Sequence, residues 1–489
     1  MDDSLAHIAA TFLASLPADT LVSVFPIDPL DRLGVPVAQA ATISRDDEST
    51  IGYGFGATRA QAELGAIGEL CEEIHVGAHV AHAPVTLASY AELGDAAVDP
   101  LTLCLPAGSP YTPDMELPWI EAQSWPSGRK VLVPREWVAA FVTQLPDTPR
   151  LITPITNGLG AGLDIEHAIA HGVLEALQRD GNVLNYRALD RGVIVDLDRD
   201  VPPDVTALVA RLQDSGIALT VKLAATDFGI ANLYVVGDDL GTPTVPIQIT
   251  ACGEAPHPDR DVALRKAVLE FCGSRARKAA THGPIEAIRR VFPSTYFERQ
   301  MASAYAEAAD EEPRAVTAMA EWIGADAATL RQRLAGTVFS DLHHVSFGDL
   351  PTVPAAQVAS SKARLDLLTS RLAAEGLEIL WIDCSPLDSP VKVVKVVVPG
   401  LECETMSYHR IGWRGVRRLR DRADPLLLDA PRPGAKLVLL RPEDEERAGG
   451  RAWFDVDLAD RIVGDLYPLY REPGPFSAQL LRQQESADA

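Results

Sequence analysis

Three segments of the chain carry side chains that could bind a hard cation or a phosphate. In two of them an oxygen-bearing pair lies three residues apart, and in the third a glutamate precedes an arginine: Glu69 and Glu72, Glu175 and Gln178, and Glu270 and Arg275. Magnesium takes oxygen ligands and usually binds through a few carboxylates together with nucleotide phosphates. Arginine can bind a phosphate through two parallel hydrogen bonds. One such pair alone is more typical of a solvated helix face, but three together indicate a cation and nucleotide site.

Each segment is expected to be a helix that begins after a turn or a strand. Glycines predict tight turns before the first two helices, at Gly52, Gly54 and Gly56 and at Gly158, Gly160 and Gly162. A strand and a polar turn lead into the third helix within 249–277. Thr58 and Gln61 are placed for a capping box, and Asp164 is placed for an N-cap. Free backbone N–H groups at such helix starts can bind an anion.

Apolar residues at helical spacing predict the buried face of the first two helices. The predicted stripes are Ala60, Leu64, Ile67, Cys71 and Ile74 in the first helix, and Ile165, Ile169, Val173, Ala176 and Leu177 in the second. The carboxylate and amide side chains lie off these stripes, so they are expected to be available for binding.

Composition bounds the class of protein. The chain has 489 residues, of which 47% are hydrophobic, and this is enough for two or three compact units or for one large domain with additions. The net charge of −24 argues against binding nucleic acid or an anionic membrane through a general basic surface. One arginine cluster departs from this balance and is expected to be a solvated helix face: Arg414, Arg417, Arg418, Arg420 and Arg422.

The six cysteines show no CxxC pairing and no zinc-ligand spacing: Cys71, Cys104, Cys252, Cys272, Cys384 and Cys403. The sequence contains neither a signal peptide nor an apolar run of about 18 residues. A reducing cytoplasm is therefore the expected location.

The nucleotide would have to bind without the common glycine motifs. No GxxxxGK[ST] occurs, so a P-loop is excluded, and the GYGFG and GLGAG runs lack GxGxxG spacing. The order of the motifs resembles the YcaO family, whose members bind ATP without a P-loop. The similar segments are GFGATRAQAELGAIGELCEE (54–73), TNGLGAGLDIEHAIAHGVLEALQRD (156–180), HPDRDVALRKAVLEFCGSR (257–275) and VKVVKVVVPGLE (391–402).

The resemblance implies a mixed α/β (α+β) fold with ATP and Mg²⁺ as cofactors. It implies metal ligation by Glu69, Glu72, Glu175 and Gln178, and nucleotide binding by Asn157, Glu270 and Arg275. It identifies no catalytic residue.

The implied activity is phosphorylation of a backbone amide oxygen in a ribosomally made peptide or protein. Attack by a Cys, Ser or Thr side chain gives an azoline, and attack by sulfide gives a thioamide. The alternative is a catalytically weak nucleotide-binding protein that assists another enzyme, for example in methylthiolation of a ribosomal protein.

Three positions depart from the family pattern. Gln178 stands where the family commonly has glutamate, so a metal site there would carry one negative charge less. Glu73 stands where arginine is usual, and Phe55 where lysine is frequent. The sequence does not decide whether these differences reduce activity.

The resemblance also sets the expected domain organisation. Residues 1–50 are expected to form an N-terminal helix and strand that precede the catalytic domain. The YcaO-like catalytic domain is expected over 51–430, with a helical segment at 293–337, and 431–489 are expected to form an extended C-terminal tail. The lead-in is too short for a leader-recognition domain, so a separate leader-recognition or sulfur-transfer partner is expected beside the peptide substrate. The missing PxPxP ending mildly favours sulfur addition or an accessory role. A homodimer is compatible with the sequence, which does not determine the oligomeric state.

Overall fold

The computed structural model describes residues 2–42, 50–241, 243, 245–307 and 311–488. The chain divides into two compact units, each built from segments that are far apart in the sequence. Unit 1 comprises Met1–Cys71, Asn185–Thr352 and Asp465–Ala489, and unit 2 comprises Glu72–Leu184 and Val353–Gly464. The predicted catalytic domain, 51–430, therefore contributes to both units. Helix α2 (Arg59–His82) crosses the division.

Unit 1 contains two sheets. The first is an antiparallel sheet in the order β1-β2-β3, formed by Val22–Pro26, Val37–Thr42 and Ile51–Phe55. The second has the order β11-β10-β9-β8-β12, formed by Cys252–His257, Ala231–Asp239, Ile217–Ala225, Val193–Asp196 and His343–Ser346. Only the β12–β8 pair in this sheet is parallel.

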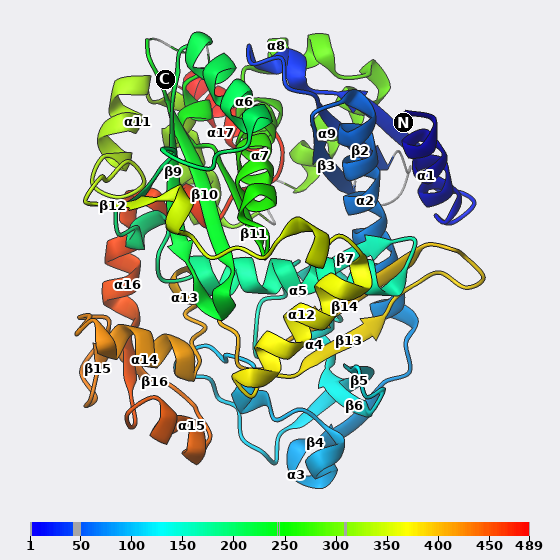
Figure 1. The fold of residues 1–489 in the computed structure, drawn as a ribbon, viewed down its shortest axis with the longest axis vertical. Helices are drawn as coiled ribbons and strands as arrows, with labels where there is room; N and C mark the ends of the chain where they lie inside the picture. The colour runs from blue at the N-terminus through cyan, green and yellow to red at the C-terminus, as the bar shows by residue number, and fades with distance from the viewer. Residues whose placement is uncertain (1, 43–49, 242, 244, 308–310, 489) are drawn as a thin grey trace. The chain divides into compact units, whose positions relative to one another are not determined.

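The helices of unit 1 cover these sheets. Figure 1 shows α6 (Pro203–Asp214) and α7 (Arg260–His282) alongside β9 and β10. The core between α7 and the sheet includes Leu233, Val235 and Phe271, all completely buried. The remaining helices of this unit are α1 (Asp2–Ala14), α8 (Ile285–Val291), α9 (Ser294–Glu307), α10 (Pro313–Gly324), α11 (Ala327–Leu334) and α17 (Ser477–Asp488).

Unit 2 is built on an antiparallel sheet in the order β4-β5-β13-β14-β7, with β6 paired to β5. These strands are Thr86–Ser89, Glu116–Trp125, Ile379–Asp383, Lys392–Val397, Leu159–Gly162 and, for β6, Lys130–Pro134. Helix α5 (Ile165–Asn182) packs on β7 and β14 and is itself covered by α12 (Ser361–Ala374). This arrangement places the second motif helix against β14, which lies in the similar segment 391–402.

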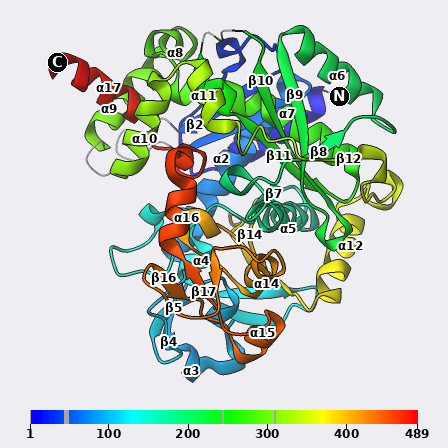
Figure 2. The same cartoon turned by 90° about the vertical axis from the view of Figure 1, so that its left-hand side faces the viewer.

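A small three-stranded sheet, β15-β17-β16, completes unit 2, and Figure 2 shows α16 beside its strands. Its strands are Leu427–Leu428, Trp453–Asp455 and Ala435–Leu437. The remaining helices of the unit are α3 (Tyr90–Leu93), α4 (Arg135–Val138), α13 (Thr405–Tyr408), α14 (Trp413–Asp421), α15 (Pro442–Arg447) and α16 (Val456–Val463). No helix in the described part of the chain is both long enough and apolar enough to cross a membrane.

The mixed α/β fold class is confirmed, and the segment 293–337 is helical as predicted. The end of the chain differs from the prediction, because 431–488 forms strands and helices instead of an extended tail. Phe476 is completely buried, and its ring lies 5.6 Å from that of Phe297. The charged residues of this segment alternate with apolar residues that are buried in unit 2 up to Gly464 and in unit 1 from Asp465 onward.

Candidate nucleotide and metal site

Each of the three motif helices packs closely against a glycine of the strand that precedes it. Gly54 in β3, Gly160 in β7 and Gly253 in β11 each lie directly on the backbone of the following helix. A Cβ atom added at any of them would lie within 2.1 Å of a helix carbonyl oxygen. Only glycine permits this close approach of strand and helix.

The prediction of glycine turns before the first two helices was therefore wrong in part. Most of these glycines belong to strands, β3 over Ile51–Phe55 and β7 over Leu159–Gly162. Gly158 does need the left-handed region, with φ at +87°. The glycines serve close packing, which a pattern of small residues cannot distinguish from a tight turn.

The predicted helix starts are confirmed. Asp164 accepts a hydrogen bond from the backbone N–H of His167 at 2.6 Å, and it caps α5. The Thr58 hydroxyl accepts from the N–H of Gln61 at 3.3 Å, and the Gln61 side chain accepts from the N–H of Thr58 at 3.2 Å. These reciprocal bonds form the expected capping box.

The buried faces agree with the prediction in part: Ile165 and Ala176 of α5 are only half-buried, whereas Ile67 and Cys71 of α2 are buried as predicted. Ile169, Val173 and Leu177 are buried as expected. In α2 the completely buried residues include Ala62 and Ala66, which lie outside the predicted stripe, because Gly54 and Gly52 rest on that face. Small residues such as alanine do not stand out in the pattern of large apolar residues that predicts a buried helix face. They nevertheless allow the strand to approach the helix closely.

Two of the predicted metal ligands are held by backbone N–H groups of the preceding strand segment. In unit 1, Glu69 accepts a hydrogen bond from the N–H of Tyr53 at 2.6 Å. In unit 2, Glu175 accepts one from the N–H of Gly158 at 3.0 Å. Both carboxylates are half-buried. A carboxylate fixed through one oxygen in this way is oriented before any cation arrives, which suits a magnesium ligand.

The other predicted ligands lie on the same helices. Glu72 is half-buried one turn beyond Glu69 on α2. Gln178 is only 7% exposed on α5, so it is not a solvated helix residue. Asn157 lines a cavity in unit 2, and Glu270 is half-buried on α7 next to Gly253.

No three His, Cys, Asp or Glu side chains of the described residues are gathered into a set that could hold a metal ion. Magnesium commonly keeps water and nucleotide phosphates among its ligands, so it does not require such a set. The donor chemistry of the oriented carboxylates fits Mg²⁺ with ATP. The assignment of metal ligation to Glu69, Glu72, Glu175 and Gln178 stays a prediction.

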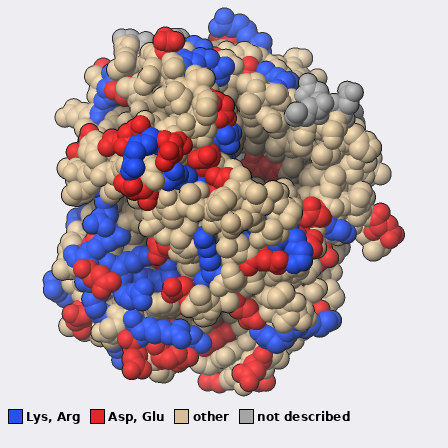
Figure 3. Space-filling view, in the orientation of Figure 1, with Lys and Arg blue, Asp and Glu red and all other residues tan. Residues whose placement is uncertain are grey.

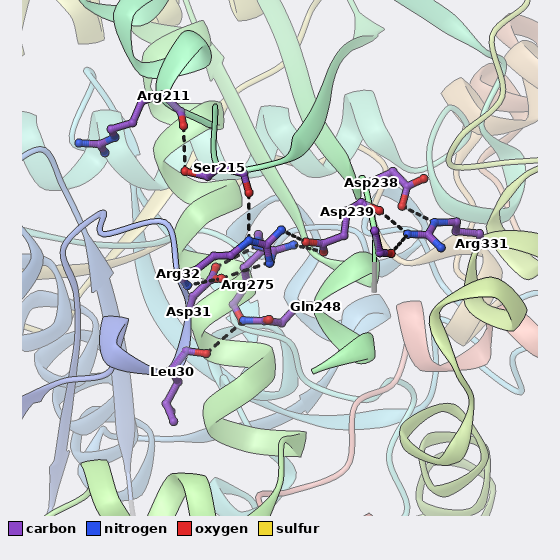
Figure 4. Close-up of polar contacts among 11 residues, drawn as sticks. Leu30, Asp31, Arg32, Arg211, Ser215, Asp238, Asp239, Gln248, Arg275 and Arg331 are labelled. Carbon is purple, nitrogen blue, oxygen red and sulfur yellow. Dashed lines mark hydrogen bonds and ion pairs between the residues drawn. The ribbon is translucent and has the colours of Figure 1, made fainter. Parts of the chain in front are cut away.

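Arg275 has partners that the sequence did not suggest. Its guanidinium is completely buried, and it donates to Asp31 from Nε at 2.9 Å and to Asp239 from Nη1 at 2.9 Å (Figure 4). Arg32 also contacts Asp239, and Gln248 donates to the backbone oxygen of Arg275 at 3.3 Å. This geometry argues against a phosphate contact by Arg275, because both carboxylates would lose their buried counter-ion.

Arg277, which the sequence reasoning missed, is a more accessible cation than Arg275: its side chain is 39% exposed, although it pairs with Glu472 at 3.5 Å. It lies seven residues after Glu270, and therefore on the same face of α7, whereas Arg275 lies five residues after it. Its guanidinium lies 5.9 Å from the centre of the Tyr53 ring. The carboxylate of Glu472 raises the pKa of Arg277 most strongly, and that of Glu69 adds to the effect. Helical register was the signal that could have found Arg277.

Lys395 is a second residue that the sequence reasoning missed. It lies in β14, 2% exposed, and its Nζ donates to the backbone oxygen of Ile155 at 2.7 Å. Burial lowers its pKa to about 8, although the carboxylate of Glu175 opposes this shift. The run VKVVKVVV predicted a buried strand correctly but gave no indication that a buried ammonium faces the α5 segment.

The arginine cluster is a solvated helix face only in part, because Arg417 is exposed but Arg414 is 3% exposed and Arg418 is half-buried. Figure 3 shows basic side chains gathered over the region where Figure 1 places α14 and α15. Beneath that surface, Arg414 and Arg418 contact the Asp180 carboxylate at 3.2 and 2.7 Å. Burial alone would raise the pKa of Asp180, but the two arginines outweigh burial and lower it. They fix the C-terminal end of α5.

One of the two departures in the first motif has a structural explanation. Phe55 packs against Gly273 of α7, where an added Cβ would lie 3.0 Å from the phenylalanine ring. It therefore joins β3 to α7 within unit 1. Glu73 is half-buried on α2, and nothing in the structure explains its difference from the family pattern.

Comparisons with known proteins identify the same family that the sequence motifs resemble. The model of the YcaO family, described as YcaO cyclodehydratase, ATP- and Mg²⁺-binding, matches residues 53–402. A protein of Methanothermobacter thermautotrophicus is 27% identical over 387 residues, which cover 79% of this chain and 90% of that protein. A Mycobacterium tuberculosis protein is 26% identical over 422 residues, which cover 83% of this chain and 85% of that protein.

Two solved structures share the fold. YcaO from Methanopyrus kandleri, bound with AMPPCP and Mg²⁺, has a TM-score of 0.58 at 20% identity and covers 84% of this chain and 93% of its own. A heterocyclase in complex with substrate and cofactor has a TM-score of 0.61 at 19% identity. That match covers 82% of this chain but only 52% of the heterocyclase. The family description confirms the expected cofactors, ATP and Mg²⁺, and because the family model covers most of the sequence, the chain belongs to the YcaO family.

Proposed function

We propose that the chain uses ATP to activate a backbone amide in a ribosomally made peptide or protein. The product is an azoline when a neighbouring Cys, Ser or Thr side chain adds to the amide carbon, and a thioamide when sulfide adds. The observation that carries this proposal is the family match over 53–402, which includes all three motif helices.

The proposed magnesium ligands are Glu69 and Glu72 on α2 and Glu175 and Gln178 on α5. The support is that backbone N–H groups already orient Glu69 and Glu175. Bound ATP with Mg²⁺ would supply the phosphoryl group that turns the amide oxygen into a leaving group. The protein's contribution is then positioning and charge neutralisation, as in other phosphoryl transfers.

On α7 we assign the phosphate-facing cation to Arg277 and retain Glu270 as a nucleotide-site residue. Both residues lie on one face of the helix, and Arg277 lies near Glu69 within unit 1. In unit 2, Asn157 keeps its proposed nucleotide role, and Lys395 lies near Glu175. Arg275 is proposed as a structural residue that fixes α7 through Asp31 and Asp239.

The experiment is co-expression of the full chain with the short peptides encoded beside its gene, followed by mass spectrometry of each peptide. Loss of one water per modified residue indicates an azoline, and replacement of oxygen by sulfur indicates a thioamide. The Glu175→Gln variant is the control for ATP dependence. Unmodified peptides, with magnesium-dependent nucleotide binding intact, would favour the accessory role. That alternative is supported by the neutral amide of Gln178 at a position that commonly carries a carboxylate.

We also propose that a separate protein presents the peptide or supplies the sulfur. The described residues 2–42 form α1, β1 and β2 and pack within unit 1, so they are part of its fold. Affinity purification of the tagged chain, with and without its neighbouring gene products, tests this part of the proposal.

Gln178→Glu is expected to lower the magnesium concentration needed for half-maximal ATP turnover. A unit charge about 4 Å from a cation gains roughly 4 kcal/mol at an effective dielectric of about 20, although desolvation of the carboxylate removes much of this. The measurement is ATP turnover against magnesium concentration. The control is His171→Glu, which adds the same charge at an exposed position of α5. Superimposable curves for wild type and Gln178→Glu would place Gln178 outside the metal shell.

A further inference from the structure

Unit 2 contains a cavity that joins the second motif to the segment after β14. Its volume is about 80 Å³. Apolar side chains form most of its wall, and the polar side chains that line it are Glu136, Asn157, Lys395, Glu402, Cys403 and Arg410. Ala176 of α5 also lines it, next to Glu175 in the sequence. The cavity therefore borders residues of the proposed phosphoryl-transfer machinery within the same unit.

Arg410 is a buried cation with an unsatisfied donor in this cavity. The residue is 3% exposed, and its Nε and Nη2 donate to the backbone oxygens of Cys104 at 3.0 Å and Leu103 at 3.2 Å. Its Nη1 has no hydrogen-bond partner among the described residues. A buried, unpaired guanidinium nitrogen is costly unless a ligand accepts its hydrogen bond. With the Lys395 ammonium in the same lining, the cavity is suited to a small anion.

Two cysteines from distant segments meet beside Arg410. Both are reduced; Cys403 is half-buried and lines the cavity, whereas Cys104 lies behind it at 2% exposure. The Cys104 thiol donates to the backbone oxygen of Leu401 at 3.2 Å, two residues before Cys403. Interaction with Cys104, and then Arg410, lowers the pKa of Cys403, whereas interaction with Cys403 and burial raise the pKa of Cys104. Cys403 therefore reaches the cavity with the lower thiol pKa, and Cys104 is buried next to it.

We propose that Cys403 accepts sulfane sulfur from a small anionic persulfide or polysulfide bound in this cavity, with Cys104 as the resolving thiol. This proposal deepens the sulfur-adding branch of the proposed function and rests on it. Arg410 and Lys395 attract the anionic sulfur species to the cavity. Hydrosulfide released here would emerge beside α5, where the activated amide is proposed to react.

The chemistry balances in two steps. The Cys403 thiolate attacks the outer sulfur of the donor persulfide, the donor S–S bond breaks, and the donor leaves as a thiol that keeps the proton. Cys403 then carries a persulfide. The Cys104 thiol attacks the inner sulfur, loses its proton, and forms a Cys104–Cys403 disulfide while hydrosulfide leaves. A low-molecular-weight dithiol must reduce this disulfide, and it is itself oxidised to its disulfide.

Several charged groups set the reactivity of Cys403 besides Cys104. Arg410 favours its thiolate, whereas Glu402 and Glu404 oppose it. Lys395 and Glu136 also line the cavity, and burial raises the pKa of Glu136 and of Glu402. Glu402 accepts hydrogen bonds from the N–H groups of Gly412 at 2.8 Å and Gly415 at 2.6 Å.

The first test compares iodoacetate with iodoacetamide, which carry the same reactive carbon but differ in charge. At low ionic strength, Cys403 in the full chain is expected to react several-fold faster with iodoacetate, measured by peptide mass spectrometry. Cys252 is the internal control, because it is also half-buried but burial next to Glu254 raises its thiol pKa. Arg410→Lys and Lys395→Gln should each reduce the preference for iodoacetate. Equal rates for the two reagents at Cys403 would overturn the anion site.

The second test uses inorganic polysulfide. In Cys104→Ser the persulfide should be trapped on Cys403 as a mass gain of one sulfur atom, and the wild type should release sulfide and form the Cys104–Cys403 disulfide. Cys403→Ser should do neither, while it still binds AMPPCP with magnesium. Sulfur loading should also persist in Glu175→Gln, which separates this proposal from failure of the ATP site. Persulfide spread over all cysteines, or sulfide release unaffected by Cys403→Ser, would contradict it.

Discussion

Glu175→Gln is expected to lower magnesium-dependent ATP turnover by roughly 10²–10³-fold while the fold is retained, as for other losses of an oriented electrostatic group. The glutamine oxygen can still accept the hydrogen bond from Gly158, so the side chain keeps its place. What is lost is one of the negative charges that hold the dication at the proposed metal site. The measurement is ADP release by the purified chain, with circular dichroism to check folding.

The same helix provides a matched control for this substitution. Glu166→Gln removes an equal charge from the first turn of α5, far along the helix from Glu175, and it should leave turnover nearly unchanged. Glu69→Gln in unit 1 should match the loss in Glu175→Gln, with Glu63→Gln on α2 as its control. Full turnover in both Glu69→Gln and Glu175→Gln would remove these carboxylates from the metal site.

Arg275→Leu is expected to destabilise the protein by about 3–5 kcal/mol, the range for removing one partner of a buried ion pair. Asp31 and Asp239 would be left as buried carboxylates without this counter-ion. The measurement is the shift of the urea unfolding midpoint for the transition of unit 1. A normal midpoint combined with lost nucleotide affinity would restore Arg275 to the phosphate site.

Arg265→Leu is the control for Arg275→Leu because it lies on the same helix. Its partner is Asp204, and the two side chains are 38% and 58% exposed. Exposed pairs contribute about 0–1 kcal/mol, so this variant should unfold near the wild-type midpoint. The comparison separates burial of the ion pair from the general loss of an arginine on α7.

The sequence was informative where structure is determined locally. The helix starts at Asp164 and Thr58 depend on residues within a few turns of each other and were predicted correctly, as was most of the buried stripe of α5. The face of α2 was predicted only in part, because Ala62 and Ala66 are buried by glycine contacts instead of large apolar side chains. Propensity and periodicity contain no information about such close backbone approaches.

The site was less predictable because its partners come from distant segments. The sequence suggested Arg275 as a phosphate ligand, but in the structure its guanidinium forms ion pairs with Asp31 and Asp239, which come from other segments of the chain. The role of Arg414 depends on Asp180, which lies more than 200 residues earlier. The Cys104–Cys403 pair was hidden for the same reason, since neither cysteine belongs to a short motif.

The central claim is that the carboxylates of the motif helices bind nucleotide through magnesium. The most direct test is calorimetric titration of AMPPCP into the full chain, with magnesium and then with excess chelator. Binding is expected to require magnesium, because uncompensated carboxylates repel the phosphates. Glu69→Gln and Glu175→Gln should each weaken it strongly, because each removes a negative charge that holds the metal ion. Nucleotide affinity that is unchanged by the chelator would contradict it.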